Sequence, residues 1–196
     1  MIEKLIIATT NNHKVKEIEN IFHNSIKEVL KMPNDIDNII ENGNTFFDNA
    51  LIKAKAVYYH TKLPSLADDS GLCINALGGE PGIYSARYGG EELSYKEKMK
   101  LILEKLKNKS DRSAYFITSA VCMIDDNYFI AVEGIVNGRI IECERGVEGF
   151  GYDPIFIPDN YNITYAEMSL EEKNKISHRA IAMNKMKNIL ESIYKI

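Results

Sequence analysis

Short apolar runs alternate with segments of helical spacing along the first part of the chain. Residues 4–9 (KLIIAT) form a β-rich apolar run, and residues 27–31 are a second candidate strand. Between them, apolar residues recur at the spacing of one helix face: Val15, Ile18, Ile21 and Phe22. The pattern predicts a strand, a polar turn and a helix in succession.

Capping boxes predict two further helices, because a Ser or Thr and an acidic residue three positions later satisfy the first backbone N–H groups. One box pairs Thr45 with Asp48, and the other pairs Ser94 with Glu97. Ser177 is predicted to cap a C-terminal helix. The buried stripe of that helix would consist of Ala182, Met186, Ile189, Leu190 and Ile193.

Alternation with a period of two replaces helical spacing from Ser113 to Cys143. The polar segment 125–127 and the Asn-Gly pair at 137–138 divide this region into three β-rich stretches. Both interruptions are typical of tight turns, so the region is predicted to be an antiparallel meander.

The apolar run 63–67 leads into two adjacent carboxylates, Asp68 and Asp69, followed by Ser70-Gly71. This order predicts a buried strand that stops at the carboxylates and then turns tightly. Successive strand side chains point to opposite faces, so one carboxylate can hold a cation while the other braces the turn. The alternative is a polar turn after a core strand, with no further role.

Composition and charge narrow the classes of protein. The chain has 196 residues, 45% of them hydrophobic and 27% charged, which is ordinary for a soluble globular protein. A net charge of −4 argues against a nucleic-acid binder with a broad basic face but allows a pocket for one nucleotide. Cys73, Cys122 and Cys143 form no CxxC pair and are predicted to be buried thiols. With no signal peptide or membrane span recognised, a cytoplasmic location is expected.

The turn after the first strand is a candidate anion site. A strand–turn–helix start presents backbone N–H groups and a positive dipole end. Lys14 lies in the first helical turn, where a cation is unfavourable for the helix, so a bound phosphate would account for it. The alternative is that Asn11 or Asn12 only caps the helix and Lys14 is solvated.

The start of the C-terminal helix carries cations in the same unfavourable position. His178 and Arg179 follow the predicted cap, and Lys173 lies just upstream. An electron-rich ligand would account for this arrangement. The alternative is that His178 is an ordinary surface or core histidine.

A glycine-flanked aromatic segment, Glu148-Gly149-Phe150-Gly151-Tyr152-Asp153-Pro154, follows the β-rich region. An exposed Phe150 could stack on a base, an interaction worth about 1–3 kcal/mol. The alternative is a phenylalanine tucked under its own loop. Carboxylates at Glu41 and Asp69 suit Mg²⁺ shared with substrate phosphates, and lysines suit the phosphates. These residues together indicate a Mg²⁺-dependent enzyme acting on a nucleoside phosphate.

Longer motifs connect these segments from one end of the chain to the other. They are Thr9-x-Asn11-x-x-Lys14-x-x-Glu17, Glu41-x-Gly43-x-Thr45-Phe46, Asn49-Ala50-x-x-Lys53-Ala54, Ala67-Asp68-Asp69-Ser70-Gly71-Leu72, Gly82-Ile83-Tyr84-Ser85-Ala86-Arg87-Tyr88, Gly149-Phe150-Gly151-Tyr152-Asp153-Pro154 and Ser177-His178-Arg179. In these motifs and their order, the chain resembles the inosine triphosphate pyrophosphatase family, also called non-canonical purine NTP or dITP/XTP pyrophosphatases.

The resemblance implies an α/β fold that forms a single domain over residues 1–196. An elongated mixed β-sheet flanked by helices would form two lobes with a nucleotide cleft between them. The implied reaction is Mg²⁺-dependent hydrolysis of ITP, dITP or XTP to the monophosphate and pyrophosphate, which cleanses the nucleotide pool. A homodimer is also implied, with a small nucleoside triphosphate as substrate and neither nucleic acid nor membrane as partner.

The resemblance further implies a role for each site residue. Asp69 would accept the proton and, with Glu41, hold Mg²⁺, while Asp68 would support it and Glu17 is a further candidate carboxylate. The triphosphate would be held by Thr9, Asn11, Lys14, Lys53 and Lys173, with Ser70 nearby. The other expected substrate-binding residues of the first turn are Thr10, Asn12 and His13. The base would be bound by Phe150, Gly151, Tyr152, Asp153, His178 and Arg179, the last two donating to the 6-oxo group.

The sequence departs from the family pattern at two places. The family often has an Asp and an Asn where the helix here opens with Ser94-Tyr95-Lys96-Glu97, and it commonly has Gly at Thr10. The local capping box can replace the first pair structurally, whereas Thr10 could alter phosphate affinity.

Three other functions compete with this interpretation. A related house-cleaning pyrophosphatase would prefer modified pyrimidine or canonical triphosphates, and Ser177-His178-Arg179 argues against it. A nucleotide-sensing protein without catalysis conflicts with the intact Glu41, Asp69 and Lys14. A Mg²⁺ nuclease fits the carboxylates but not the acidic balance of the chain.

Overall fold

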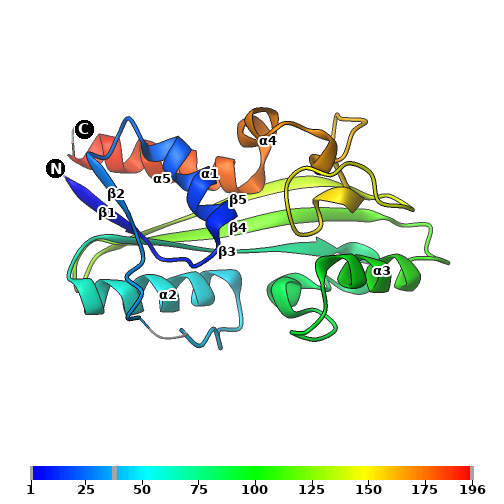
Figure 1. Cartoon of the computed structure of the whole chain (residues 1–196), viewed down its shortest axis with the longest axis horizontal. Coiled ribbons are helices and arrows are strands. Elements are labelled where there is room, and N and C mark those ends of the chain that lie inside the picture. Colours follow the sequence, from blue (N-terminus) through cyan, green and yellow to red (C-terminus); the bar gives the residue numbers. More distant parts are fainter. Residues whose placement is uncertain (1, 37–38, 195–196) are drawn as a thin grey trace. The chain divides into compact units, whose positions relative to one another are not determined.

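The computed structural model describes residues 2–36 and 39–194, in which strands and helices alternate as far as β4 (Ser113–Met123) (Figure 1). The strands and α-helices in chain order are β1 (Lys4–Ile7), α1 (Asn12–Phe22), β2 (Glu28–Lys31), α2 (Phe46–Thr61), β3 (Ser65–Ile74), α3 (Tyr95–Lys105), β4 (Ser113–Met123), β5 (Phe129–Ile140), β6 (Phe156–Pro158), α4 (Leu170–Ile176) and α5 (His178–Tyr194). Short 3₁₀ helices span Asn75–Leu77, Gly82–Arg87, Asp153–Ile155 and Tyr165–Glu167.

The six strands form one mixed sheet in the order β2-β1-β3-β4-β5-β6. β1 pairs in parallel with β2 and β3, whereas β5 and β6 are antiparallel. The α/β class with a mixed sheet and flanking helices is therefore confirmed, and β2 is the strand predicted at residues 27–31.

The chain divides into two compact units. Unit 1 contains Met1–Asp69, Thr118–Gly134 and Arg179–Ile196, and unit 2 contains Ser70–Ile117 and Ile135–His178. The single domain expected over residues 1–196 stays a prediction. Within the two described stretches, no helix is both long and apolar enough to cross a membrane.

Both faces of the sheet are covered in unit 1. Leu5 and Ile7 of β1 belong to the apolar cluster that includes residues of α1 and α5. Ile6 and Ala8, which alternate with them, belong to the cluster that includes residues of α2. Figure 1 shows α2 on one face of the sheet and α1 and α5 on the other. Because both faces of β1 are covered, the residues that follow Lys4 in this strand form a continuous apolar run.

The predicted helix starts are present. The Asn11 side chain caps α1, Thr45 and Asp48 form the capping box of α2, and Ser94 and Glu97 form that of α3. Each of these caps joins groups only a few residues apart, so the local sequence is enough to predict it.

The predicted stripe of α5 is wrong at one end. Ala182, Met186 and Leu190 are buried, but Ile193 is 45% exposed. In the last helical turn it is Tyr194, and not Ile193, that packs against the apolar cluster of unit 1.

Unit 2 has an aromatic core. Phe116 of β4 lies edge-on to Phe156 of β6, with ring centroids 4.8 Å apart, and Tyr165 lies 5.9 Å from Phe116. Leu72 of β3 and Ile102 of α3 belong to the same buried cluster.

β3 does not end at the two carboxylates, so the predicted stop and the turn at residues 70–71 are wrong. The strand runs from Ser65 to Ile74 through Asp68, Asp69, Ser70 and Gly71. β3 lies between β1 and β4 in the sheet, where both of its edges have a neighbouring strand. This pairing outweighs the local turn preference of the polar residues.

The predicted turn at Asn137-Gly138 is also wrong, because β5 continues through both residues to Ile140. Gly138 pairs with Pro158 of β6, and a Cβ at Gly138 would lie 2.2 Å from the carbonyl oxygen of Ile157. The glycine thus permits close approach of β6. The other predicted interruption, residues 125–127, does connect β4 to β5.

Gly138→Ala is expected to lower the free energy of unfolding by about 1–3 kcal/mol, because the added methyl would overlap the backbone of β6. Urea unfolding measures this change. Asn137→Ala, at an exposed position of the same strand, is the control and should change stability by less than about 0.5 kcal/mol. Equal effects of both substitutions would contradict the close approach.

The cysteines only partly match the prediction. Cys73 and Cys122 are buried, and burial raises the pKa of Cys122 to about 12. Cys143 is exposed, so the prediction of three buried thiols is wrong at this position. It follows the end of β5 in a segment where residues 142–149 are all exposed.

Candidate functional site

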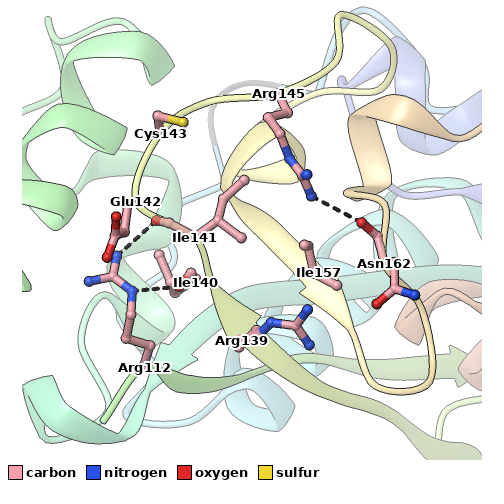
Figure 2. A pocket seen from close by; sticks show the side chains of 9 residues that line it. All are labelled: Arg112, Arg139, Ile140, Ile141, Glu142, Cys143, Arg145, Ile157 and Asn162. Carbon is pink, nitrogen blue, oxygen red and sulfur yellow. Dashed lines mark hydrogen bonds between the residues drawn. The ribbon is translucent and has the colours of Figure 1, made fainter. Parts of the chain in front are cut away.

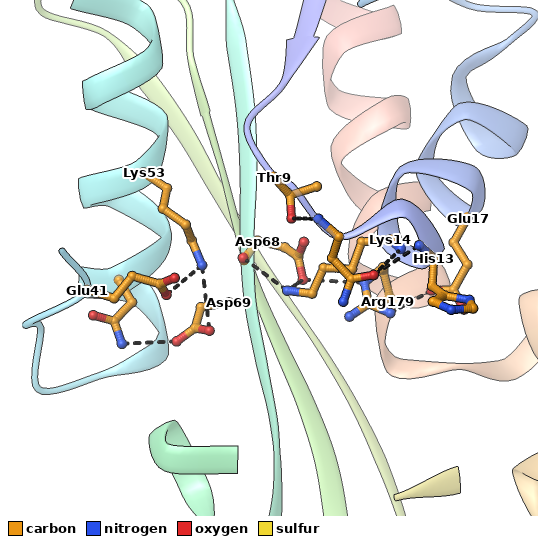
Figure 3. A network of polar contacts seen from close by, with 11 residues as sticks. Thr9, His13, Lys14, Glu17, Glu41, Lys53, Asp68, Asp69 and Arg179 are labelled. Carbon is orange, nitrogen blue, oxygen red and sulfur yellow. Dashed lines mark hydrogen bonds and ion pairs between the residues drawn. The ribbon is translucent and has the colours of Figure 1, made fainter. Parts of the chain in front are cut away.

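The two adjacent aspartates of β3 face opposite sides of the sheet, as the alternation of strand side chains predicts. Figure 3 shows Asp68 directed toward Lys14 and Arg179, and Asp69 directed toward Lys53 and Glu41. All of these residues belong to unit 1. We refer to Lys14, Glu17, Glu41, Lys53, Asp68, Asp69 and Arg179 as the charged cluster.

Asp68 is the centre of a buried set of ion pairs. Its Oδ2 lies 2.9 Å from Lys14 Nζ and 3.3 Å from Arg179 Nε. Arg179 Nη1 also donates to Glu17 Oε2 at 2.5 Å. Burial alone would lower the pKa of Arg179, but the charges of Asp68 and Glu17 outweigh it and raise that pKa. Arg179 is therefore a permanent cation held by two carboxylates.

In the first turn of α1, the cation of Lys14 is paired with the carboxylate of Asp68. Lys14 is not solvated, since its ammonium contacts both a carboxylate oxygen and the main-chain oxygen of Asp68. Burial lowers the pKa of Lys14, and the charge of Asp68 opposes this shift. The Asn11 side chain already accepts hydrogen bonds from the N–H groups of His13 and Lys14. A phosphate at this turn would thus rely mainly on side chains.

The remaining polar residues of this turn are near the surface. Thr9 Oγ1 accepts from the backbone N–H of Asn11 at 3.2 Å. Thr10, Asn12 and His13 are exposed. The sequence-predicted residues from Thr9 to Lys14 therefore remain together on one β1–α1 turn.

Asp69 meets a second set of groups, carried by α2 and by the segment before it. Lys53 Nζ lies 2.7 Å from Glu41 Oε2 and 3.7 Å from Asp69 Oδ1. Asn49, one helical turn before Lys53, donates from Nδ2 to Asp69 Oδ2 at 3.1 Å. Burial raises the pKa of Asp69, and the charges of Lys53 and Lys14 partly offset this rise. Ser70 follows as the next residue of β3.

The pair Glu41 and Asp69 fits a divalent cation that shares its ligands with a substrate. Both carboxylates converge on one positive charge, the ammonium of Lys53. Among residues 2–36 and 39–194, no group of three or more His, Cys, Asp and Glu side chains is arranged to hold a metal. Two carboxylates suit Mg²⁺, which commonly takes one or two of them together with substrate phosphates and water.

Asn49 is a polar residue of this site for which the sequence predicted no role. It is only 1% exposed and makes side-chain hydrogen bonds at both of its ends. The available signal was its spacing of four residues from Lys53, which puts both side chains on one helix face.

The aromatic loop, Gly149–Asp153, lies in unit 2 and is held by its own aspartate. Asp153 Oδ2 accepts from the backbone N–H of Phe150 at 2.8 Å. Gly149 has a φ of +74°, and a Cβ there would lie 2.2 Å from Asp153 Oδ2, so the tight turn requires glycine. Phe150 itself is half-buried.

Lys173 of α4 completes this arrangement. Its Nζ lies 2.7 Å from Asp153 Oδ2 and 4.6 Å from the centroid of the Phe150 ring. The residue is 2% exposed. The family resemblance implies that Lys173 binds phosphate, but its neighbours here, Asp153 and Phe150, are those of the predicted base site.

Tyr152 anchors the other side of the aromatic loop. Its hydroxyl donates to the carbonyl oxygen of Ser85 at 2.8 Å, and its ring lies edge-on to Tyr95 at 5.4 Å. Burial raises the pKa of Tyr152 well above its ordinary value, so the hydroxyl stays protonated and can donate.

His178 and Arg179 are adjacent in sequence but have different neighbours. The His178 ring stacks on Phe116 with centroids 4.6 Å apart, and Tyr165 lies 6.4 Å away. Arg179 instead belongs to the charged cluster of unit 1. The interpretation of His178 as an ordinary buried histidine and its predicted contact with a base are both compatible with this stacking.

Unit 2 also contains a recess of about 410 Å³ that none of the predicted site residues line (Figure 2). Arg112, Arg139 and Arg145 surround an apolar floor that includes Ile141 and Ile157. Arg112 donates to the carbonyl oxygens of residues 140 and 141, which fixes its guanidinium as part of the fold.

Comparison with known proteins gives consistent matches along almost the whole chain. The sequence profile of the Ham1 family matches residues 5–189. A dITP/XTP pyrophosphatase of Treponema denticola is 45% identical over 92% of this chain and 94% of its own. Another of Aquifex aeolicus is 43% identical over 98% of each chain. The solved structure of a HAM1 protein from Coxiella burnetii has a TM-score of 0.90 and 36% identity, covering 96% of this chain and 98% of its own.

Proposed function

Because this chain belongs to the Ham1 family, we propose that it hydrolyses non-canonical purine nucleoside triphosphates to the monophosphate and pyrophosphate. The substrates would be ITP, dITP and XTP, and the reaction would remove them from the nucleotide pool. The observation that carries the proposal is the convergence of Glu41 and Asp69 on a single positive charge, beside the basic β1–α1 turn.

Glu41 and Asp69 would hold the Mg²⁺ ion that the proposed reaction uses. Bound there, Mg²⁺ would neutralise charge on the phosphate oxygens of the substrate. Lys53, which bridges the two carboxylates here, would then be available to contact a phosphate.

Asp69 would accept a proton from the attacking water. The water oxygen would bond to the α-phosphorus, and the bond from this phosphorus to the bridging oxygen would break, releasing pyrophosphate. Burial raises the pKa of Asp69 above that of an ordinary aspartate, which makes it a stronger base.

The β1–α1 turn would bind the triphosphate. Lys14 is held against Asp68, which is itself held by Arg179, so the ammonium has a defined position. The other residues proposed to contact the phosphates are Thr9, Thr10, Asn11, Asn12, His13, Lys53 and Ser70. Asp68 would act by positioning Lys14, without contact to the substrate.

The aromatic loop would bind the base. Phe150 would stack on the purine, and Gly151, Tyr152 and Asp153 would fix its position. Because Lys173 contacts Asp153 and lies over Phe150, we assign it to the base and not to the triphosphate.

Hydrogen-bond donors near the base would select the 6-oxo group. His178 would donate a hydrogen bond to this oxygen. Adenine carries an amino group at the same position, so the donor of His178 would face another donor and no hydrogen bond would form. The donation by Arg179 to the 6-oxo group stays a prediction. In the structure, the guanidinium of Arg179 is bound to Glu17 and Asp68. The homodimer and the cytoplasmic location stay predictions as well.

Turnover of ITP, XTP, GTP, ATP and UTP with Mg²⁺, with pyrophosphate and orthophosphate detected separately, tests the proposal. We expect pyrophosphate release, with kcat/KM for ITP and XTP at least about 10²-fold above that for ATP. Replacing Mg²⁺ by EDTA should abolish turnover. Preferred hydrolysis of UTP or a modified pyrimidine triphosphate would indicate the competing house-cleaning specificity, and orthophosphate release would refute attack at the α-phosphorus.

A further inference from the structure

Asn49 is a buried polar residue whose side chain contacts both Asp69 and the segment that carries Glu41. It lies on α2, is 1% exposed, and uses both ends of its amide. Its Oδ1 accepts from the backbone N–H of Gly43 at 2.9 Å, and its Nδ2 donates to Asp69 Oδ2 at 3.1 Å. The amide therefore connects the strand that carries Asp69 to the segment that carries Glu41.

These two partners fix which way the amide points. The N–H of Gly43 can only donate, so it requires the oxygen of Asn49 on its side. The amino group must then face Asp69, where a carboxylate oxygen accepts from it. The contact orients Asp69 Oδ2 toward Asn49, and Oδ1 is the oxygen that faces Lys53, 3.7 Å from its Nζ.

Gly43 brings the Glu41 segment unusually close to α2. A Cβ at Gly43 would lie 2.5 Å from Asp48 Cβ and 2.9 Å from the backbone nitrogen of Asn49. Only glycine fits this approach, which keeps the N–H of Gly43 within reach of Asn49. Glu41 lies two residues earlier, and its carboxylate meets Lys53 on the same face of α2.

We propose that Asn49 is a positioning residue that sets the two cation-binding carboxylates relative to one another. It acts through Asp69 and through the main chain next to Glu41, without contact to substrate. The inference rests on the proposed function, because it takes Glu41 and Asp69 as the Mg²⁺ ligands. Residues that orient metal ligands in this way typically change metal affinity or activity by about 10–100-fold when they are replaced.

Asn49→Leu tests the proposal, since leucine has a similar volume but neither donates nor accepts. Two measurements are made on the full chain: the rise in thermal unfolding temperature with added Mg²⁺ alone, and the Mg²⁺ concentration for half-maximal ITP turnover. We expect both to require about 10–100-fold more Mg²⁺ than in the unsubstituted protein. If Asn49→Leu does not fold, Asn49→Ser, which is smaller, is measured in the same way.

Ser65→Ala is the matched control. Ser65 is fully buried in β3, and its Oγ donates to the carbonyl oxygen of Ala54 in α2 at 2.6 Å, so its loss removes a buried contact between the same two elements. It should lower the unfolding temperature but leave the Mg²⁺ requirement unchanged. If Asn49→Leu and Ser65→Ala shift the Mg²⁺ requirement equally, Asn49 is only structural and the proposal is overturned.

Different results would contradict the proposed function and the role of Asn49. Absence of Mg²⁺-dependent stabilisation and of turnover in the unsubstituted protein would overturn the proposed function. Normal Mg²⁺ dependence in both the unsubstituted protein and the Asn49 variants would overturn only the role of Asn49.

Discussion

Asp69→Asn is expected to reduce the kcat for ITP by about 10³-fold. The substitution keeps the shape of the side chain but removes both the proton acceptor and one of the two carboxylates proposed to hold Mg²⁺. Steady-state turnover at saturating Mg²⁺ measures the effect. The free energy of unfolding should change little, because the lost attraction to Lys53 is offset by relief from burying a charge.

The control for Asp69→Asn is Asp126→Asn, which removes an exposed carboxylate beside Lys62 in the same unit. It should leave kcat unchanged. Wild-type turnover by Asp69→Asn would refute the assignment of the base, whatever its effect on Mg²⁺ affinity.

Arg179→Met is expected to lower the free energy of unfolding by about 3–5 kcal/mol. It removes one partner from a buried network and leaves Asp68 and Glu17, both almost fully buried, without their shared cation. Urea unfolding at neutral pH measures the loss. This cost arises from the charged cluster and should appear without any nucleotide.

Arg145→Met provides a matched comparison in unit 2. Arg145 lies 3.5 Å from Glu167, but both side chains are substantially exposed, so the expected cost is below about 1 kcal/mol. The double substitution Glu17→Gln with Arg179→Met should recover part of the lost stability, since it removes one of the uncompensated charges. Equal costs for Arg145→Met and Arg179→Met would contradict the structural role of the buried network.

Secondary structure followed from the sequence where its signals were local. The capping boxes at Thr45 and Ser94 and the Asn11 cap involve groups within a few residues of one another. The carboxylate pair and Asn137-Gly138 also resembled turns, yet both lie inside strands. Pairing with neighbouring strands decided these two cases, and a local pattern contains no information about those neighbours.

For the candidate site as well, local features were predictable from the sequence, whereas contacts between distant residues were not. Alternation along β3 correctly predicted that Asp68 and Asp69 face opposite sides. The position of Lys14 in a helix start suggested either a bound phosphate or a solvated side chain, and it does not reveal that Asp68 is its partner. The family resemblance grouped Lys173 with the phosphate-binding residues, whereas the structure shows it in contact with Asp153 and Phe150.

By itself, the sequence determined the helix starts, the opposite orientation of the two aspartates and the family resemblance. The tertiary structure decided where β3 and β5 end and which partner each charged side chain has. The physical reason is range: a cap satisfies N–H groups within the same turn, whereas Lys14 meets Asp68 across 54 positions and Arg179 meets Asp68 across 111. Contacts of that range depend on how the sheet and helices pack, and the packing exists only in the folded chain.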